Sequence, residues 1–152
     1  MELQNFINRT TQDGILGIKI TQNGEDIGKH LWDEECRRNV YSVSKSFTSA
    51  AVGIAIKEGL LALEETLADA FAEDMPENPG EFLLQATVRD LLTMCLGQET
   101  PALMGEQRPL YREQDWVKMS LAFPFTCRPG TTFVYNNVGP YLAGVLVQRR
   151  AG

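Results

Sequence analysis

The sequence contains one histidine and three cysteines among its 152 residues. His30 is therefore the only imidazole that could serve as a catalytic base, and it lies in a β-prone segment where we expect a structural role. Three cysteines without metal-ligand spacing form no disulfide framework and suit a reducing compartment. No zinc-binding His-Glu-x-x-His, Walker loop or Cys-x-x-Cys motif is present. We therefore expect neither a metal nor another cofactor.

Long apolar runs and clustered positive charge are missing as well. No run reaches the roughly 18 apolar residues of a transmembrane helix, and the N-terminal stretch MELQNFINRTTQDG has neither the basic region nor the apolar core of a signal peptide. The net charge is -6, whereas nucleic acids and anionic membranes select clustered Lys and Arg. We expect a cytoplasmic protein that binds neither, and the sequence leaves its oligomeric state open.

The N-terminal region predicts a β-hairpin over residues 15–32. Two β-prone runs flank Asn23-Gly24, a pair that accepts the positive φ angles of a tight hairpin turn. Two strands alone are marginally stable in water. The hairpin should therefore need further strands or a helix to cover it.

The next segment predicts a helix that is buried on all sides, because residues 50–56 are apolar on every face. Lys57 in its last turn and Gly59 just beyond are typical of a helix C-terminus. The leading end of this helix is polar, however, with Ser42, Ser44 and Lys45 close together. A polar end on an apolar helix calls for a functional explanation.

The remainder of the chain predicts mainly short helices. Thr87-Val-Arg-Asp90 has the form of a capping box, and Gly97 is predicted to end the helix that it opens. The other predicted elements are a short helix over residues 65–74, a loop over 98–112, an extended segment over 131–135, and helices over 115–123 and 138–150.

Ser42-Val-Ser-Lys45 is the first motif that suggests chemistry. A spacing of three places both side chains on one helix face. A desolvated lysine favours its neutral form and can accept the serine proton, and a helix N-terminus stabilises negative charge that develops nearby. This arrangement activates a serine without a histidine. The same residues are also compatible with a helix cap beside a solvent-directed lysine.

Tyr135-Asn-Asn137 is the second motif. A lysine ammonium nearby would favour the tyrosine phenolate, which could relay protons, and an asparagine can hold a lysine or a substrate amide. A surface turn with a half-buried aromatic residue is the alternative interpretation. Together, and in this order, the two motifs favour a catalytic site.

Tyr41 and Lys45 also fit a Tyr-x-x-x-Lys pattern that looks like the active-site helix of short-chain dehydrogenases. That fold needs a glycine-rich nucleotide loop after an early strand. Gly14-Ile-Leu-Gly17 does not match such a loop, and 40 preceding residues are too few for a nucleotide-binding half. We keep this as the less favoured alternative.

The motifs in their context resemble the β-lactamase-related serine hydrolases, which include class C β-lactamases, D-alanyl-D-alanine peptidases and related esterases and amidases. The similar stretches are YSVSKSFTSAAVGIAIKEGLLALEETL, TVRDLLTMCLG and RPGTTFVYNNVGPYLAGVLVQRRAG. The resemblance implies an α+β fold in which an N-terminal β-hairpin joins C-terminal strands and a mostly helical region lies between them.

The resemblance also implies roles for four residues. Ser42 would be the acylated nucleophile, with its backbone N–H as one half of an oxyanion hole, and Lys45 would take its proton. Tyr135 would pass a proton to the leaving group, and Asn137 would orient Lys45 and the substrate. Which of Lys45 and Tyr135 acts as the first base stays open. The implied substrate is a small-molecule or peptide ester or amide.

Two departures from the family pattern matter. Residues 94–96 read Met-Cys-Leu where the family has His-Thr-Ser, and the late Lys-Thr-Gly or His-x-Gly motif is absent. We therefore expect residues 1–152 to be one partial domain, with an arm and hairpin over 1–40, a nucleophile helix and helical region over 41–152, and the C-terminal strands missing. Loss of an oxyanion donor costs about 10²–10³ in rate, so little activity is expected alone. A non-catalytic binding or sensor module on the same scaffold is the alternative function.

Overall fold

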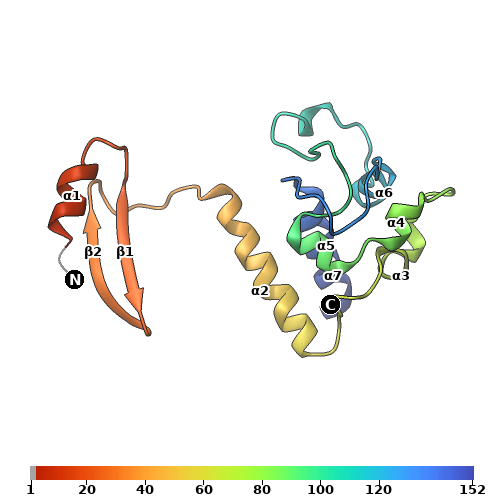
Figure 1. The fold of residues 1–152 in the computed structure, drawn as a ribbon, viewed down its shortest axis with the longest axis horizontal. Coiled ribbons are helices and arrows are strands. Elements are labelled where there is room, and N and C mark those ends of the chain that lie inside the picture. Colours follow the sequence, from red (N-terminus) through yellow and green to blue (C-terminus); the bar gives the residue numbers. More distant parts are fainter. Residues whose placement is uncertain (1–2) are drawn as a thin grey trace. The chain divides into compact units, whose positions relative to one another are not determined.

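The computed structural model describes residues 3–152. The chain divides into two compact units, Met1–Val40 and Tyr41–Gly152, which are described separately (Figure 1). Within the described residues, no helix is long and apolar enough to span a bilayer.

The first unit contains a short helix and a β-hairpin. Helix α1 (Gln4–Thr10) precedes strands β1 (Gly17–Gln22) and β2 (Glu25–Leu31), which pair antiparallel. The connecting turn has Asn23 at φ 52° and Gly24 at φ 84°. These are the left-handed conformations that the Asn-Gly pair predicts, so the hairpin expected over residues 15–32 is confirmed.

Packing within this unit is thin. Trp32 makes edge-on ring contacts with His30, at a centroid distance of 4.6 Å, and with Phe6, at 6.3 Å. No residue from 3 to 40 is buried. The unit is therefore held by one antiparallel pairing and a small aromatic cluster, without a core of its own.

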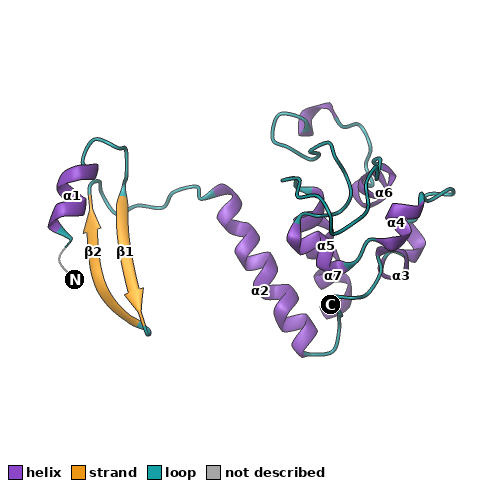
Figure 2. Ribbon diagram, viewed as in Figure 1, coloured by secondary structure: helices purple, strands orange, loops and turns teal. Residues whose placement is uncertain are grey.

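The second unit is helical. Figure 2 shows its helices joined by loops, and no strand occurs among residues 41–152. Its elements are η1 (Tyr41–Val43), α2 (Ser44–Lys57), α3 (Leu67–Ala70), η2 (Ala72–Asp74), α4 (Glu81–Gln85), α5 (Val88–Thr93), η3 (Arg108–Leu110), α6 (Trp116–Ala122) and α7 (Val138–Ala151). The helices predicted over 115–123 and 138–150 are confirmed, and residues 131–135, predicted as an extended segment, lie outside any helix or strand.

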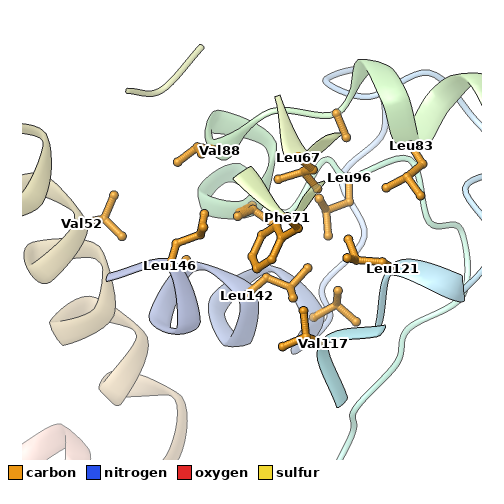
Figure 3. Packing of buried hydrophobic residues seen from close by; sticks show 14 of the residues in the cluster. Val52, Leu67, Phe71, Leu83, Val88, Leu96, Val117, Leu121, Leu142 and Leu146 are labelled. Carbon is orange, nitrogen blue, oxygen red and sulfur yellow. The ribbon is translucent and has the colours of Figure 1, made fainter. Parts of the chain in front are cut away.

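The hydrophobic core surrounds α7, the last helix of the chain. Leu142 and Leu146 of this helix are buried against Phe71 and neighbouring side chains from the other helices of the unit (Figure 3). Helix α7 packs against α2, α5 and α6. The helix therefore joins α2 to the rest of the unit.

Helix α2 is not buried on all sides, contrary to the expectation from its composition. Only Val52 and Ala55 are buried, while Phe47 is 74% exposed and Ile54 is 58% exposed. The helix packs mainly on α7 and η1, which cover one face. An apolar sequence predicts that a helix can be buried on every face, but it does not say which faces a given chain covers.

Helix α5 begins as predicted and ends earlier. The Thr87 N–H and hydroxyl both donate to the Asp90 carboxylate, at 2.9 and 2.7 Å, so the capping box forms. The helix ends at Thr93, because Met94 adopts a left-handed conformation with φ 56°. Gly97 instead allows a close approach, since a Cβ there would lie 2.2 Å from the Cys127 carbonyl oxygen.

Candidate active site

Ser42 and Lys45 meet at the amino end of helix α2. Ser42 lies in η1, which is one turn of 3₁₀ helix, and Lys45 lies in the first turn of α2. Their spacing of three residues brings both side chains to one face of the helical segment. The Lys45 Nζ donates a hydrogen bond to the Ser42 Oγ at 3.0 Å. The preceding residue, Tyr41, has φ 46°, a conformation that costs energy for a residue other than glycine and that is common near functional sites.

Tyr135 reaches the same oxygen from the loop before α7. Its hydroxyl donates to the Ser42 Oγ at 2.6 Å, across a separation of 93 residues. The Lys45 Nζ lies 5.2 Å from the centroid of the Tyr135 ring. This loop is held in place beside Tyr135, because the N–H of the preceding residue, Val134, donates a hydrogen bond to the Met94 carbonyl at 3.0 Å. The structure thus brings Ser42, Lys45 and Tyr135 together.

The environment of Tyr135 lowers the pKa of its phenol. The hydrogen bond with Ser42 and then the contact with Lys45 lower the pKa of the Tyr135 phenol, while partial burial opposes them. Both Lys45 and Tyr135 donate to the Ser42 oxygen. The serine can therefore lose its own proton to either group once that group is deprotonated.

The amino end of α2 adds to the electrostatics beside Ser42. The N-cap residue of this helix, Val43, makes no side-chain capping hydrogen bond. Aligned peptide dipoles place partial positive charge at this end. Negative charge that develops on an attacked carbonyl near Ser42 would therefore be stabilised.

Asn137 lies at the N-cap of α7, where it holds a loop. Its side-chain amide donates to the Leu103 carbonyl at 2.9 Å, and its backbone N–H donates to the Ala102 carbonyl at 3.1 Å. The Met104 sulfur is a further contact of this amide, at 3.7 Å. Asn137 therefore connects the Tyr135 segment to the loop over residues 98–112.

A cavity of about 390 Å³ opens beside Ser42 and Lys45, a volume within the usual range of small-molecule sites. Asn137 also lines it, together with Tyr41, Ser44, Leu103, Arg108, Trp116 and Tyr141. No functional role was expected from the sequence for the last four of these residues. Trp116 makes the ring contacts expected of a packing residue, with Tyr111 and Tyr141, and also forms part of the cavity wall. These four residues lie far from Ser42 along the chain, so no local spacing relates them to it.

Other kinds of site find little support among the described residues. Residues 3–152 hold no cluster of three or more His, Cys, Asp or Glu side chains that could bind a metal ion. The only sheet in this range is the antiparallel hairpin. The dehydrogenase alternative based on Tyr41 and Lys45 requires a parallel β-α-β unit, which this part of the chain does not contain.

Comparison with known proteins places these residues in context. The protein-family model described as Beta-lactamase matches residues 4–152. Two similar solved structures are a protein from Bacteroides dorei DSM 17855 provisionally described as a β-lactamase, with a TM-score of 0.72 and 18% identity, and a class C β-lactamase, with a TM-score of 0.70 and 20% identity. Each similarity covers 99% of this chain, and 46% and 42% of those chains respectively.

A third similar structure is a protein from Bacillus anthracis provisionally described as a 6-aminohexanoate-dimer hydrolase. Its TM-score is 0.59 at 21% identity, over 97% of this chain and 42% of that chain. The chain thus spans less than half the length of these three structures. The structural similarities confirm the α+β fold class predicted from the sequence.

Proposed function

Because the chain belongs to the β-lactamase family, we propose that it is a serine hydrolase that cleaves an amide or ester bond through an acyl-enzyme on Ser42. The observation that supports this most is the convergence on one oxygen. The Ser42 Oγ lies 3.0 Å from the Lys45 Nζ and 2.6 Å from the Tyr135 hydroxyl, beside a cavity of suitable size.

The first half of the proposed reaction forms the acyl-enzyme. The Ser42 oxygen bonds to the substrate carbonyl carbon, while its proton passes to a neutral Lys45 amine or to the Tyr135 phenolate. The carbonyl oxygen becomes negatively charged near the amino end of α2. The bond to the leaving amine or alcohol then breaks, and that group takes up a proton from Tyr135 or Lys45.

The second half releases the product. A water molecule loses a proton to Lys45 or Tyr135, and its oxygen bonds to the acyl carbon. The bond between that carbon and the Ser42 oxygen then breaks, and Ser42 takes a proton back from the same residue. A module that binds without turnover would stop after the first half. The lifetime of the acyl adduct therefore distinguishes the hydrolase from the binding or sensor alternative.

Chromogenic ester and β-lactam substrates test this proposal. The protein is mixed with each substrate, product release is followed by absorbance, and samples quenched during the reaction are examined by intact-protein mass spectrometry. Because little turnover is expected of residues 1–152 alone, the decisive result is one acyl adduct on Ser42, and any product release that is measured should fall to the uncatalysed rate in Ser42→Ala. Ser44→Ala is the matched control, because Ser44 lines the same cavity but forms no hydrogen bond with Lys45 or Tyr135 among the described residues.

Each outcome has a separate meaning. A stable adduct on Ser42 without turnover would favour the binding or sensor alternative. Turnover that survives Ser42→Ala, or an adduct on another residue, would contradict the proposal. Absence of any adduct on Ser42 would contradict it too.

A further inference from the structure

We propose that Arg108 is a specificity-determining residue that binds a carboxylate group of the substrate in the cavity beside Ser42. This inference rests on the proposed function and adds a property of the substrate. Arg108 opens the 3₁₀ turn η3 and lines the cavity together with Ser42 and Lys45. It comes from the loop over residues 98–112, far from Ser42 along the chain.

The charged residues that line the cavity are all basic. Lys45 and Arg108 are its two charged lining residues among those described, and no Asp or Glu lines it. Within residues 3–152, no carboxylate lies at ion-pair distance from the Arg108 guanidinium. Asp115, the chain neighbour of the cavity residue Trp116, is the N-cap of α6, where its carboxylate accepts from two backbone N–H groups at 3.1 Å. Arg108 therefore has its charge available for a ligand.

The loop that carries Arg108 is fixed by the side chain of the preceding residue. The Gln107 Oε1 accepts from the Met104 N–H at 3.0 Å and from the Tyr111 hydroxyl at 3.2 Å, and its Nε2 donates to the Pro101 carbonyl at 3.1 Å. The Arg108 N–H also donates to the Met104 carbonyl, at 3.2 Å. The backbone at Arg108 is thus held before any ligand binds.

Leu103 connects the loop over residues 98–112 to Asn137, which lies two residues after Tyr135. Leu103 is buried, lines the cavity and has φ 57°. Its N–H donates to the Tyr111 hydroxyl at 3.3 Å, and its carbonyl accepts from the Asn137 amide at 2.9 Å. Two hydrogen bonds therefore hold a costly backbone conformation. The result is a preformed wall, and preformed walls lower the entropic cost of binding.

The lining chemistry indicates which ligand group would fit. A guanidinium can pair with both oxygens of a carboxylate, through two parallel hydrogen bonds. Trp116 and Tyr141 pack edge-on, with centroids 6.2 Å apart, and offer an aromatic surface to an apolar body. The matching substrate is an ester or amide with an apolar body and a carboxylate, its scissile carbonyl at Ser42.

Boronic acids test this inference without requiring turnover, because boron binds a nucleophilic serine reversibly. Matched straight-chain boronic acids, one ending in a methyl group and the other in a carboxylate, are compared over a series of chain lengths by titration calorimetry. At the best length we expect the carboxylate member to bind about tenfold more tightly. Arg108→Gln should abolish this preference, Arg108→Lys should reduce it, and added salt should weaken it.

Arg112→Gln is the matched control, since it removes the same charge from the same loop at a position that does not line the cavity. It should keep the preference, and circular dichroism should show that both glutamine variants remain folded. If neither boronic acid binds, or if binding survives Ser42→Ala, the proposed function fails and this inference with it. If both bind and Arg108→Gln keeps the same preference, or the wild type shows none, Arg108 is not the determinant and the proposed function stands.

Discussion

At the scale of single residues, the contacts of Tyr135 change the acidity of its phenol. Its hydroxyl contacts Ser42 and its ring lies beside Lys45, and these neighbours lower the pKa of the phenol. Removal of a group that stabilises the phenolate must raise that pKa again. We therefore predict that Ser42→Ala and Lys45→Met each shift the ionisation of Tyr135 to higher pH.

An ultraviolet absorbance titration checks this prediction. Subtraction of the Tyr135→Phe curve isolates the contribution of Tyr135 from those of the other three tyrosines. In the wild type the phenolate should form below the usual range of tyrosine. Unchanged curves in both variants would mean that neither neighbour influences the phenol.

The candidate site was predictable from the sequence only where its contacts are local. Ser42 and Lys45 are three residues apart, so helical geometry alone predicts that they meet. Tyr135 reaches Ser42 across 93 residues, and its residue type and motif suggested a role without fixing a distance. Arg108 belongs to no motif, and only the folded loop places it beside the cavity.

At the scale of elements, the crossing of α7 and α5 depends on one small residue. A Cβ at Gly139 would lie 2.4 Å from the Leu91 carbonyl oxygen, whereas a Cβ at Gly144, in the same helix, would have no atom within 4 Å. We predict that Gly139→Ala destabilises the protein by about 2 kcal/mol or more, because the helices must separate. Gly144→Ala should be neutral or stabilise by up to about 1 kcal/mol, since alanine favours a helix.

Urea unfolding of the two variants measures this difference. Both substitutions add the same methyl group to the same helix, so intrinsic helix propensity is matched between them. Equal midpoints for the two variants would show that the close approach of α7 to α5 does not limit stability.

The sequence predicted where most helices and strands lie. It predicted less accurately where they end and which of their faces are buried. The capping box at Thr87 and Asp90 depends on local chemistry and formed as predicted. The end of α5 depends on Met94, whose left-handed conformation no residue preference indicates, so Gly97 was wrongly assigned that role. The exposure of Phe47 and Ile54 on α2 depends on which neighbours the chain supplies, and composition does not contain that information.

At the scale of the whole molecule, stability is distributed unevenly. All buried residues lie beyond residue 40 within the described chain, and the hairpin unit has none. Regions with few buried contacts open more readily than a packed core. We predict that amides of β1 and β2 exchange with solvent faster than those of α5 and α7, by native-state hydrogen exchange. Equal protection in the two units would contradict this expectation.

The most direct measurement of the central claim is covalent labelling of Ser42. The protein is treated with a fluorophosphonate, and the modified residue is located by peptide mass mapping in the wild type, Ser42→Ala, Ser44→Ala and Lys45→Met. The account predicts one adduct on Ser42, which Ser44→Ala retains, Lys45→Met slows and Ser42→Ala abolishes. Labelling of a different residue, or of none, would contradict it.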